Sequence, residues 1–142
     1  MCNGVAAMKE ILFRGRTTAG KEWVSGFYAV FSEKPFIGAH NSYGTMLWFE
    51  VDPETVGQFT GLTDKNGKKI FEGDILDYWS SYSESLCESY ETVVFGVNNC
   101  SCCHAVYGWS TTNKYGYGRY IDNPEECVVS GNIHDNPELL EG

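Results

Sequence analysis

The stretch EVDPETVGQFTGLTDKNGKKIFEGDIL, residues 50–76, holds the clearest turn signals in the chain. Asp52 is a good helix N-cap and Pro53 fits the first helical position, so a single helical turn is predicted there. Asn66-Gly67 lies between apolar residues and is the strongest short signal for a tight β-hairpin. Short strands joined by tight turns are therefore expected in this part of the chain.

On both sides of that stretch, short runs of β-branched and aromatic residues alternate with Gly- and Ser-rich segments, which favours strands over long helices. Apolar residues occupy both alternating sets in 22–31, so both faces of that strand are expected to be covered. The predicted strands are 9–15, 22–31, 46–51, 74–79, 90–97, 104–109, 119–121 and 127–129, with a second helical turn at 136–141. Loops are expected at 32–45 (with a brief strand at Phe36-Ile37), 80–89, 98–103 and 110–118, and a seam at 58–64.

The predicted fold class is mainly β, because many short strands at close spacing are typical of a barrel or compact roll. Trp48, Trp79 and Trp109 are expected to fill the core, since a small β-domain needs bulky side chains. The expected organisation is an N-terminal extension at residues 1–7, a β-rich part at 8–60 and a barrel at 61–142.

Charge is unevenly distributed along the chain, whose formal net charge is −9. Residues 1–76 carry eight basic and nine acidic side chains, and residues 77–142 carry two basic and ten acidic ones. Nucleic acids are held mainly by cationic contacts to phosphates, so the acidic C-terminal half is a poor candidate for such a surface. The main expected role of this negative charge is solubility. The other two roles considered are binding a basic protein and mimicry of nucleic-acid charge.

A cytoplasmic location is expected, because the sequence contains neither a long apolar run that would span a membrane nor the pattern of a secretory signal. The six cysteines should then be reduced and provide no disulfide framework.

Three segments together resemble the YopX family of phage and prophage proteins. They are EILFRGR (10–16) with its partner EWVSGFY (22–28), the stretch 50–76 quoted above, and VVSGNIHDNPELLEG (128–142). The resemblance implies an SH3-like C-terminal barrel after a smaller β-rich part, and synthesis inside a bacterial host. It implies no catalytic residues, because the family's molecular function is not established. The extension 1–7 and the cysteine-rich segment near residue 100 depart from the family's pattern.

The most reactive-looking segment is Cys100-Ser101-Cys102-Cys103-His104. Zinc sites usually pair cysteines as C-x2-4-C, whereas the spacing here is C-x-C-C-H and neighbouring strand residues point to opposite faces. Cys87 or Cys127 would have to complete a ligand set. A cysteine-rich hairpin turn explains the segment better, so we expect neither a metal nor a cofactor.

Recognisable catalytic motifs are missing from the sequence. Cys103 and His104 are neighbours, which separates their side chains in a strand and disfavours a nucleophile–base pair. The run 64–69 resembles the start of a calcium loop, but its glycine comes too early and three lysines intrude. We therefore expect a protein that is not an enzyme.

The candidate binding residues are three tyrosines and an arginine in a polar, Gly-containing stretch: Tyr115, Tyr117, Arg119 and Tyr120, beside Lys114. They fit a surface that stacks bases or a protein-binding patch, although tyrosines packed on a barrel rim would look the same.

The favoured function is a non-catalytic protein-interaction module. The alternative is a nucleic-acid-binding β-barrel module, which needs a basic face. Self-association through exposed strand edges is also possible. The basic side chains available for such a face are Lys9, Arg14, Arg16, Lys21, Lys65, Lys68 and Lys69.

Overall fold

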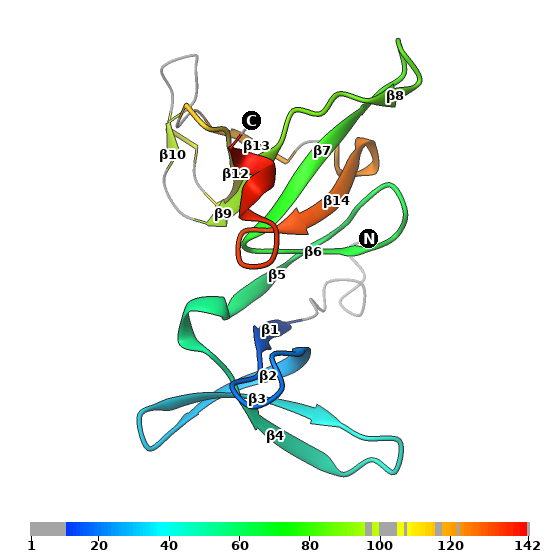
Figure 1. Ribbon diagram of the computed structural model, residues 1–142. Helices are drawn as coiled ribbons and strands as arrows, with labels where there is room; N and C mark the ends of the chain where they lie inside the picture. The colour runs from blue at the N-terminus through cyan, green and yellow to red at the C-terminus, as the bar shows by residue number, and fades with distance from the viewer. Residues whose placement is uncertain are drawn as a thin grey trace, which may run out of the picture. The chain divides into compact units, whose positions relative to one another are not determined.

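The computed structural model describes residues 11–95, 98–99, 105–106, 108–115, 118–121 and 123–141 (Figure 1). The chain is mainly β and divides into two compact units, Met1–Gly61 and Leu62–Gly142. The sequence prediction placed a boundary between residues 60 and 61.

The first unit is built on antiparallel strands in the order β4-β3-β2-β1-β5. An isolated bridge between Thr17 and Val51, next to a hydrogen bond from the Asp52 N–H to the Arg16 carbonyl (2.9 Å), brings the end of β4 back to the end of β1. The sheet therefore curls on itself. Its elements are β1 (Phe13–Arg16), β2 (Trp23–Phe31), β3 (Lys34–His40), β4 (Met46–Glu50), the 3-10 turn η1 (Pro53–Thr55) and β5 (Gly57–Thr63), which continues into the second unit.

The inner side of this sheet buries Ile37 and Val51 completely, whereas Val30 near the end of β2 is 55% exposed on the same side. A Cβ added to Gly15 would lie 2.9 Å from the Val51 side chain, so only glycine fits there. The outer side is different, and two expectations were wrong. Phe27 and Phe31 of β2 are 54% and 49% exposed, and Trp48 is 42% exposed rather than buried in the core.

The second unit contains a five-stranded antiparallel ladder in the order β13-β12-β9-β7-β14, with β8 paired to β7. Ile70, Leu76, Val93 and Cys127 form its buried core. The pairings found in the described residues leave this ladder open between β13 and β14, so closure into a barrel stays a prediction. The elements are β6 (Lys69–Phe71), β7 (Asp74–Ser80), β8 (Ser85–Leu86), β9 (Glu91–Phe95), β10 (Asn98–Asn99), β11 (Ala105–Val106), β12 (Trp109–Thr112), β13 (Gly118–Tyr120), η2 (Pro124–Glu126), β14 (Cys127–Asn132) and η3 (Pro137–Leu140).

The predicted turn at Asn66-Gly67 is confirmed, and the buried Asp64 carboxylate organises it. Its Oδ1 accepts the backbone N–H groups of Asn66 and Lys68, both at 2.8 Å, as in an Asx turn. Its Oδ2 accepts the Val129 N–H of β14 at 2.9 Å. The turn thus covers the outer edge of the last strand.

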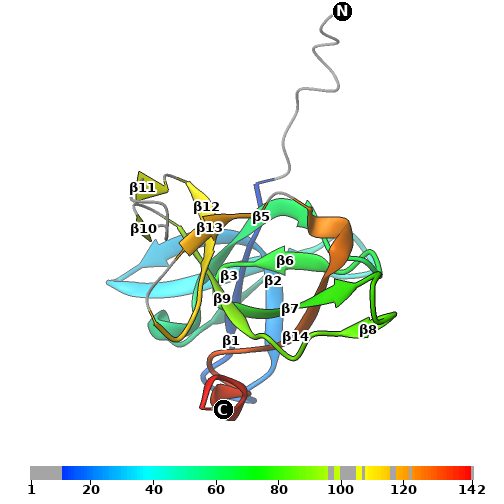
Figure 2. The same ribbon diagram turned by 90° about the horizontal axis from the view of Figure 1, so that it is seen from above.

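All four expected loops contain strand residues. The segment 32–45 holds the seven-residue β3 rather than a brief strand at Phe36-Ile37, and 98–103 begins with β10. The segment 110–118 begins inside β12, where Ser110 and Thr111 are fully buried between β9 and β13. Thr111 satisfies its hydroxyl by donating to the Glu91 carboxylate at 2.5 Å, which is how a polar residue tolerates this position. Likewise, 80–89 contains β8, which pairs with β7 (Figure 2). All but the last residue of the expected seam at 58–64 lies within β5.

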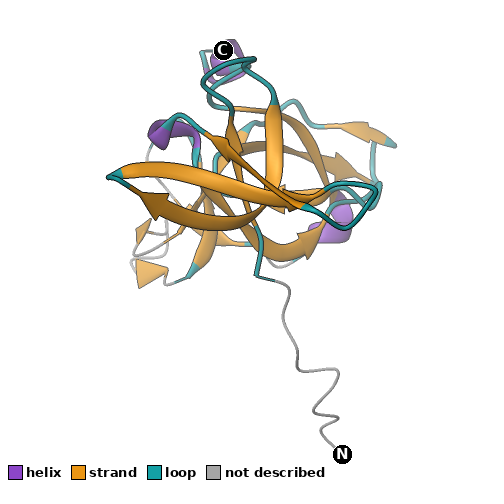
Figure 3. Ribbon diagram, turned by 90° about the horizontal axis from the view of Figure 1, so that it is seen from below, coloured by secondary structure: helices purple, strands orange, loops and turns teal. Residues whose placement is uncertain are grey.

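The two predicted helical turns are present as the 3-10 turns η1 and η3, drawn in purple in Figure 3 together with η2. None of the helices described is long and apolar enough to cross a membrane.

Candidate functional site

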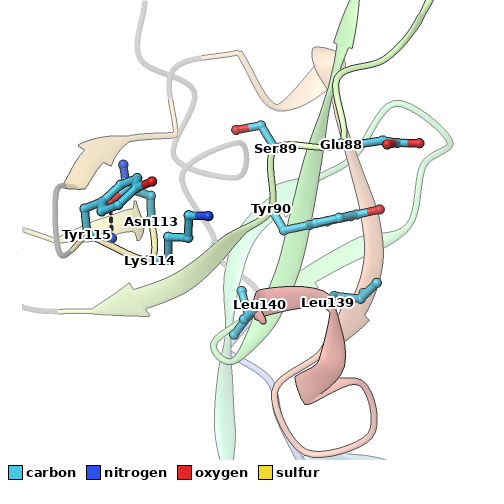
Figure 4. A pocket seen from close by; sticks show the side chains of 8 residues that line it. All are labelled: Glu88, Ser89, Tyr90, Asn113, Lys114, Tyr115, Leu139 and Leu140. Carbon is cyan, nitrogen blue, oxygen red and sulfur yellow. Dashed lines mark hydrogen bonds between the residues drawn. The ribbon is translucent and has the colours of Figure 1, made fainter. Parts of the chain in front are cut away.

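A pocket of about 400 Å³ opens in the second unit, between three segments that are distant in the sequence (Figure 4). The segments are the approach to β9, the turn between β12 and β13, and η3. The described residues that line it are Glu88, Ser89, Tyr90, Asn113, Lys114, Tyr115, Leu139 and Leu140.

The first wall, residues 88–90, is held in place by Asp77 of β7, which is only 1% exposed. Its Oδ2 accepts the Glu88 N–H at 3.1 Å, and its Oδ1 accepts the Ser89 N–H at 3.0 Å. Hydrogen bonds to an ionised acceptor are stronger than neutral ones, so this tether fixes an otherwise exposed segment. Tyr90 follows immediately and is half-buried.

The second wall is the turn Asn113–Tyr115. The Asn113 side chain accepts the Tyr115 N–H at 2.9 Å, the dashed line in Figure 4. The Lys114 ammonium lies 5.3 Å from the centre of the Tyr115 ring, close enough for a cation–π interaction. Tyr115 is 72% exposed and so offers most of its ring to a ligand.

The third wall is η3, which supplies Leu139 and Leu140, both half-buried. The turn before η3 is built on Asn132, whose Oδ1 accepts the backbone N–H groups of His134 and Asp135 at 3.0 and 2.9 Å. Asn136 returns a hydrogen bond to the Asn132 N–H at 3.2 Å. This local network places the two leucines beside Tyr90 (Figure 4).

The chemistry of the pocket is that of a recognition site. Two tyrosine rings and two leucines provide apolar contact, and Glu88 and Lys114 provide one charge of each sign. Imidazole and thiol groups do not occur among the described lining residues. Apolar walls with a few polar groups are typical of sites that bind and orient a ligand.

Of the residues singled out from the sequence, the structure places Tyr115 and Lys114 in this pocket. Tyr120 is 46% exposed at the end of β13. Arg119 is described in its backbone only, and Tyr117 lies outside the described residues.

The sulfur-rich segment Cys100, Cys102, Cys103 and His104 also lies outside the described residues. Across the part of the chain that is described, histidines, cysteines and carboxylates do not gather in a group that could hold a metal ion. Cys87 is exposed and Cys127 is buried in the core.

The sequence prediction missed Tyr90, Leu139 and Leu140 as pocket residues. Their signal was weak, because each reads as an ordinary apolar residue beside a strand or turn. Only the fold brings them next to Tyr115.

The fold and pocket define a two-unit, mainly antiparallel β protein with an open recognition pocket in its second unit. The chain belongs to the YopX family, since the family model described as "YopX protein" matches residues 13–141. This match confirms the resemblance based on residues 50–76 and their flanking segments.

Among solved structures, the chain is similar to protein EF1440 from Enterococcus faecalis. The two are 25% identical, with a TM-score of 0.50, and the match covers 94% of this chain and 99% of that one. No curated protein matches this sequence.

Proposed function

We propose that this chain is a non-catalytic protein-interaction module that uses the pocket of its second unit to hold a segment of a partner protein. The pocket carries the proposal. Tyr90, Tyr115 and the two leucines of η3 form a cleft in which one large apolar side chain can be surrounded. Tyrosines and buried apolar anchors supply most of the binding energy in protein interfaces.

The charge around this pocket favours a basic partner. Residues 62–142 contain five basic and thirteen acidic side chains, a net charge of −8. Such a field speeds the association of a positively charged partner and excludes acidic ones. The segment we expect is therefore an apolar or aromatic anchor flanked by lysine or arginine.

A binding role rather than catalysis is supported by what lines the pocket. Ser89 is the one aliphatic hydroxyl among the described lining residues, and its backbone N–H is tied to Asp77. A serine nucleophile needs an adjacent general base, and a histidine does not line this part of the pocket.

We further infer that the second unit is a variant of the SH3-like barrel. The ladder order β13-β12-β9-β7-β14, with the 3-10 turn η2 directly before the last strand, supports this inference. The YopX family resemblance supports a phage or prophage setting, with the protein acting as an accessory factor in the bacterial host cytoplasm. Fold alone does not give the activity, so the pocket remains the basis of the functional proposal.

The test is differential capture from host cells. The wild-type chain, Tyr115→Ala and the control Tyr82→Ala are immobilised and exposed to the same lysate; Tyr82 is fully exposed on the β7–β8 turn, away from the pocket residues. We expect proteins held by wild type and Tyr82→Ala, with at least about tenfold less retained by Tyr115→Ala. Identical captured sets for all three chains would refute the proposal.

A further inference from the structure

The outer side of the first unit's sheet carries several aromatic side chains that the pocket does not explain. Phe27 of β2 stands opposite Gly38, and Gly38 stands opposite Trp48 of β4, so these positions share one side of the sheet. Side chains on one side of a strand recur at every second residue, so Trp23 and Phe31 of β2 and Phe36 of β3 lie on this side too. We call this surface the aromatic face, and its rings are Trp23, Phe27, Phe31, Phe36 and Trp48.

Three rings of the aromatic face are in contact through Phe31, and several rings are open to solvent. Phe31 lies 5.4 Å from both Phe36 and Trp48, measured between ring centres. Phe27, Phe31 and Trp48 are 54%, 49% and 42% exposed. Large exposed apolar patches usually mark binding sites, so we expect the aromatic face to bind a ligand.

The strand positions that share the aromatic face carry a positive balance, whereas the chain as a whole is negative. Arg14 and Arg16 of β1 project on the same side as Trp23, with the Arg14 guanidinium 4.7 Å from a Trp23 ring centre. Lys34 stands opposite Phe31. Among the outward positions of β1 to β4, Glu50 is the one carboxylate, although the chain contains 19 acidic residues. The face therefore complements an anionic ligand.

We propose that the aromatic face binds single-stranded nucleic acid. Unpaired bases stack on exposed aromatic rings, and each such ring contributes substantially because every base has a π-face. Arg14, Arg16 and Lys34 place positive charge beside the rings, and cationic side chains meet the phosphates of a nucleic acid. A duplex hides its bases and is expected to bind more weakly.

Other occupants fit the face less well. A second copy of the chain, related by a two-fold axis through this face, would bring the same three cations together. An acidic peptide would satisfy the cations but leave the ring faces without stacking partners. Single-stranded nucleic acid matches both features at once.

The experiment is a fluorescence anisotropy titration of a labelled oligothymidylate with the full chain at about 50 mM salt, repeated at about 200 mM. Variants Phe27→Ala and Phe31→Ala remove one ring each. The control is Val30→Ala, because Val30 is 55% exposed on the same strand but points to the opposite side. Thermal melts of all chains show which variants are folded, and two ring variants keep the test valid if one is not.

We expect binding by wild type that weakens at the higher salt, a loss of about fivefold or more for each ring variant, and no change for Val30→Ala. The duplex of the same sequence with its complement should bind more weakly than the single strand.

Absence of binding at low salt would overturn the proposal. An equal loss of affinity in Val30→Ala would also overturn it. So would displacement of the oligonucleotide by polyglutamate, if both ring variants still bound the oligonucleotide as wild type does. A wild-type dimer in sedimentation that Phe31→Ala dissociates, without nucleic-acid binding, would assign the face to self-association instead.

Discussion

Replacing Asp64 by alanine should destabilise the second unit more than any exposed carboxylate would. The Asp64 carboxylate is 6% exposed and accepts three backbone N–H groups, two within its own turn and one from Val129 of β14. Alanine removes both acceptor oxygens, and with them all three hydrogen bonds, and leaves the Asp64 backbone in place. The turn then loses its internal organisation and its link to the edge of the last strand.

The three lost hydrogen bonds are not equivalent. The N–H groups of Asn66 and Lys68 belong to exposed residues and can be hydrated, so each costs about 0.5 kcal/mol. The Val129 N–H is part-buried and loses an ionised acceptor, which costs about 2 kcal/mol. The free energy of unfolding should therefore fall by about 3 kcal/mol, a shift of roughly 10–15 °C in melting temperature.

The assay is chemical denaturation followed by tryptophan fluorescence, with Glu125→Gln as the control. Glu125 is exposed in the same unit, so its replacement removes one negative charge without removing a buried acceptor. If the free energy of unfolding of Asp64→Ala lay within about 0.5 kcal/mol of this control, the structural role assigned to the turn would be wrong.

Three further changes test other parts of the fold. Gly26→Ala should cost about 3 kcal/mol or more in unfolding free energy, because the new Cβ would meet the Gly38 carbonyl oxygen of the adjacent strand; near-wild-type denaturation would contradict this. Thr111→Val should cost about 2 kcal/mol, because the buried Glu91 carboxylate loses its 2.5 Å donor, and an unchanged denaturation midpoint would argue against it. Asp77→Ala should accelerate amide exchange at residues 88 and 89 by about tenfold or more, whereas unaltered exchange there would show that the pocket wall needs no tether.

Local turn chemistry is what the sequence predicted best. The Asn66-Gly67 turn and the helical turn at Pro53 follow from local backbone preferences, which depend only on residues adjacent in the sequence. By contrast, the hydrogen bond from the Val129 N–H to Asp64 depends on which strand lies beside the turn. The buried threonine of β12 looked like a loop residue for the same reason, since its polar group is satisfied by Glu91 across the sheet.

The candidate site shows the same limit. Tyr115 stood out because an aromatic residue in a polar, glycine-containing stretch is unusual. Tyr90 and the leucines of η3 did not, because three segments far apart in the chain must fold together before they share a pocket. The exposed rings of β2 were predicted to be covered, since sequence alternation cannot tell a covered face from an open one.

Amide hydrogen exchange can show whether the pocket of the second unit binds a partner protein. The full chain is compared with and without the protein that wild type captures and Tyr115→Ala does not. We expect slower exchange at residues 88–90 and 113–115, and in η3, when the partner is bound. Protection confined to other segments, with these three unchanged, would contradict it.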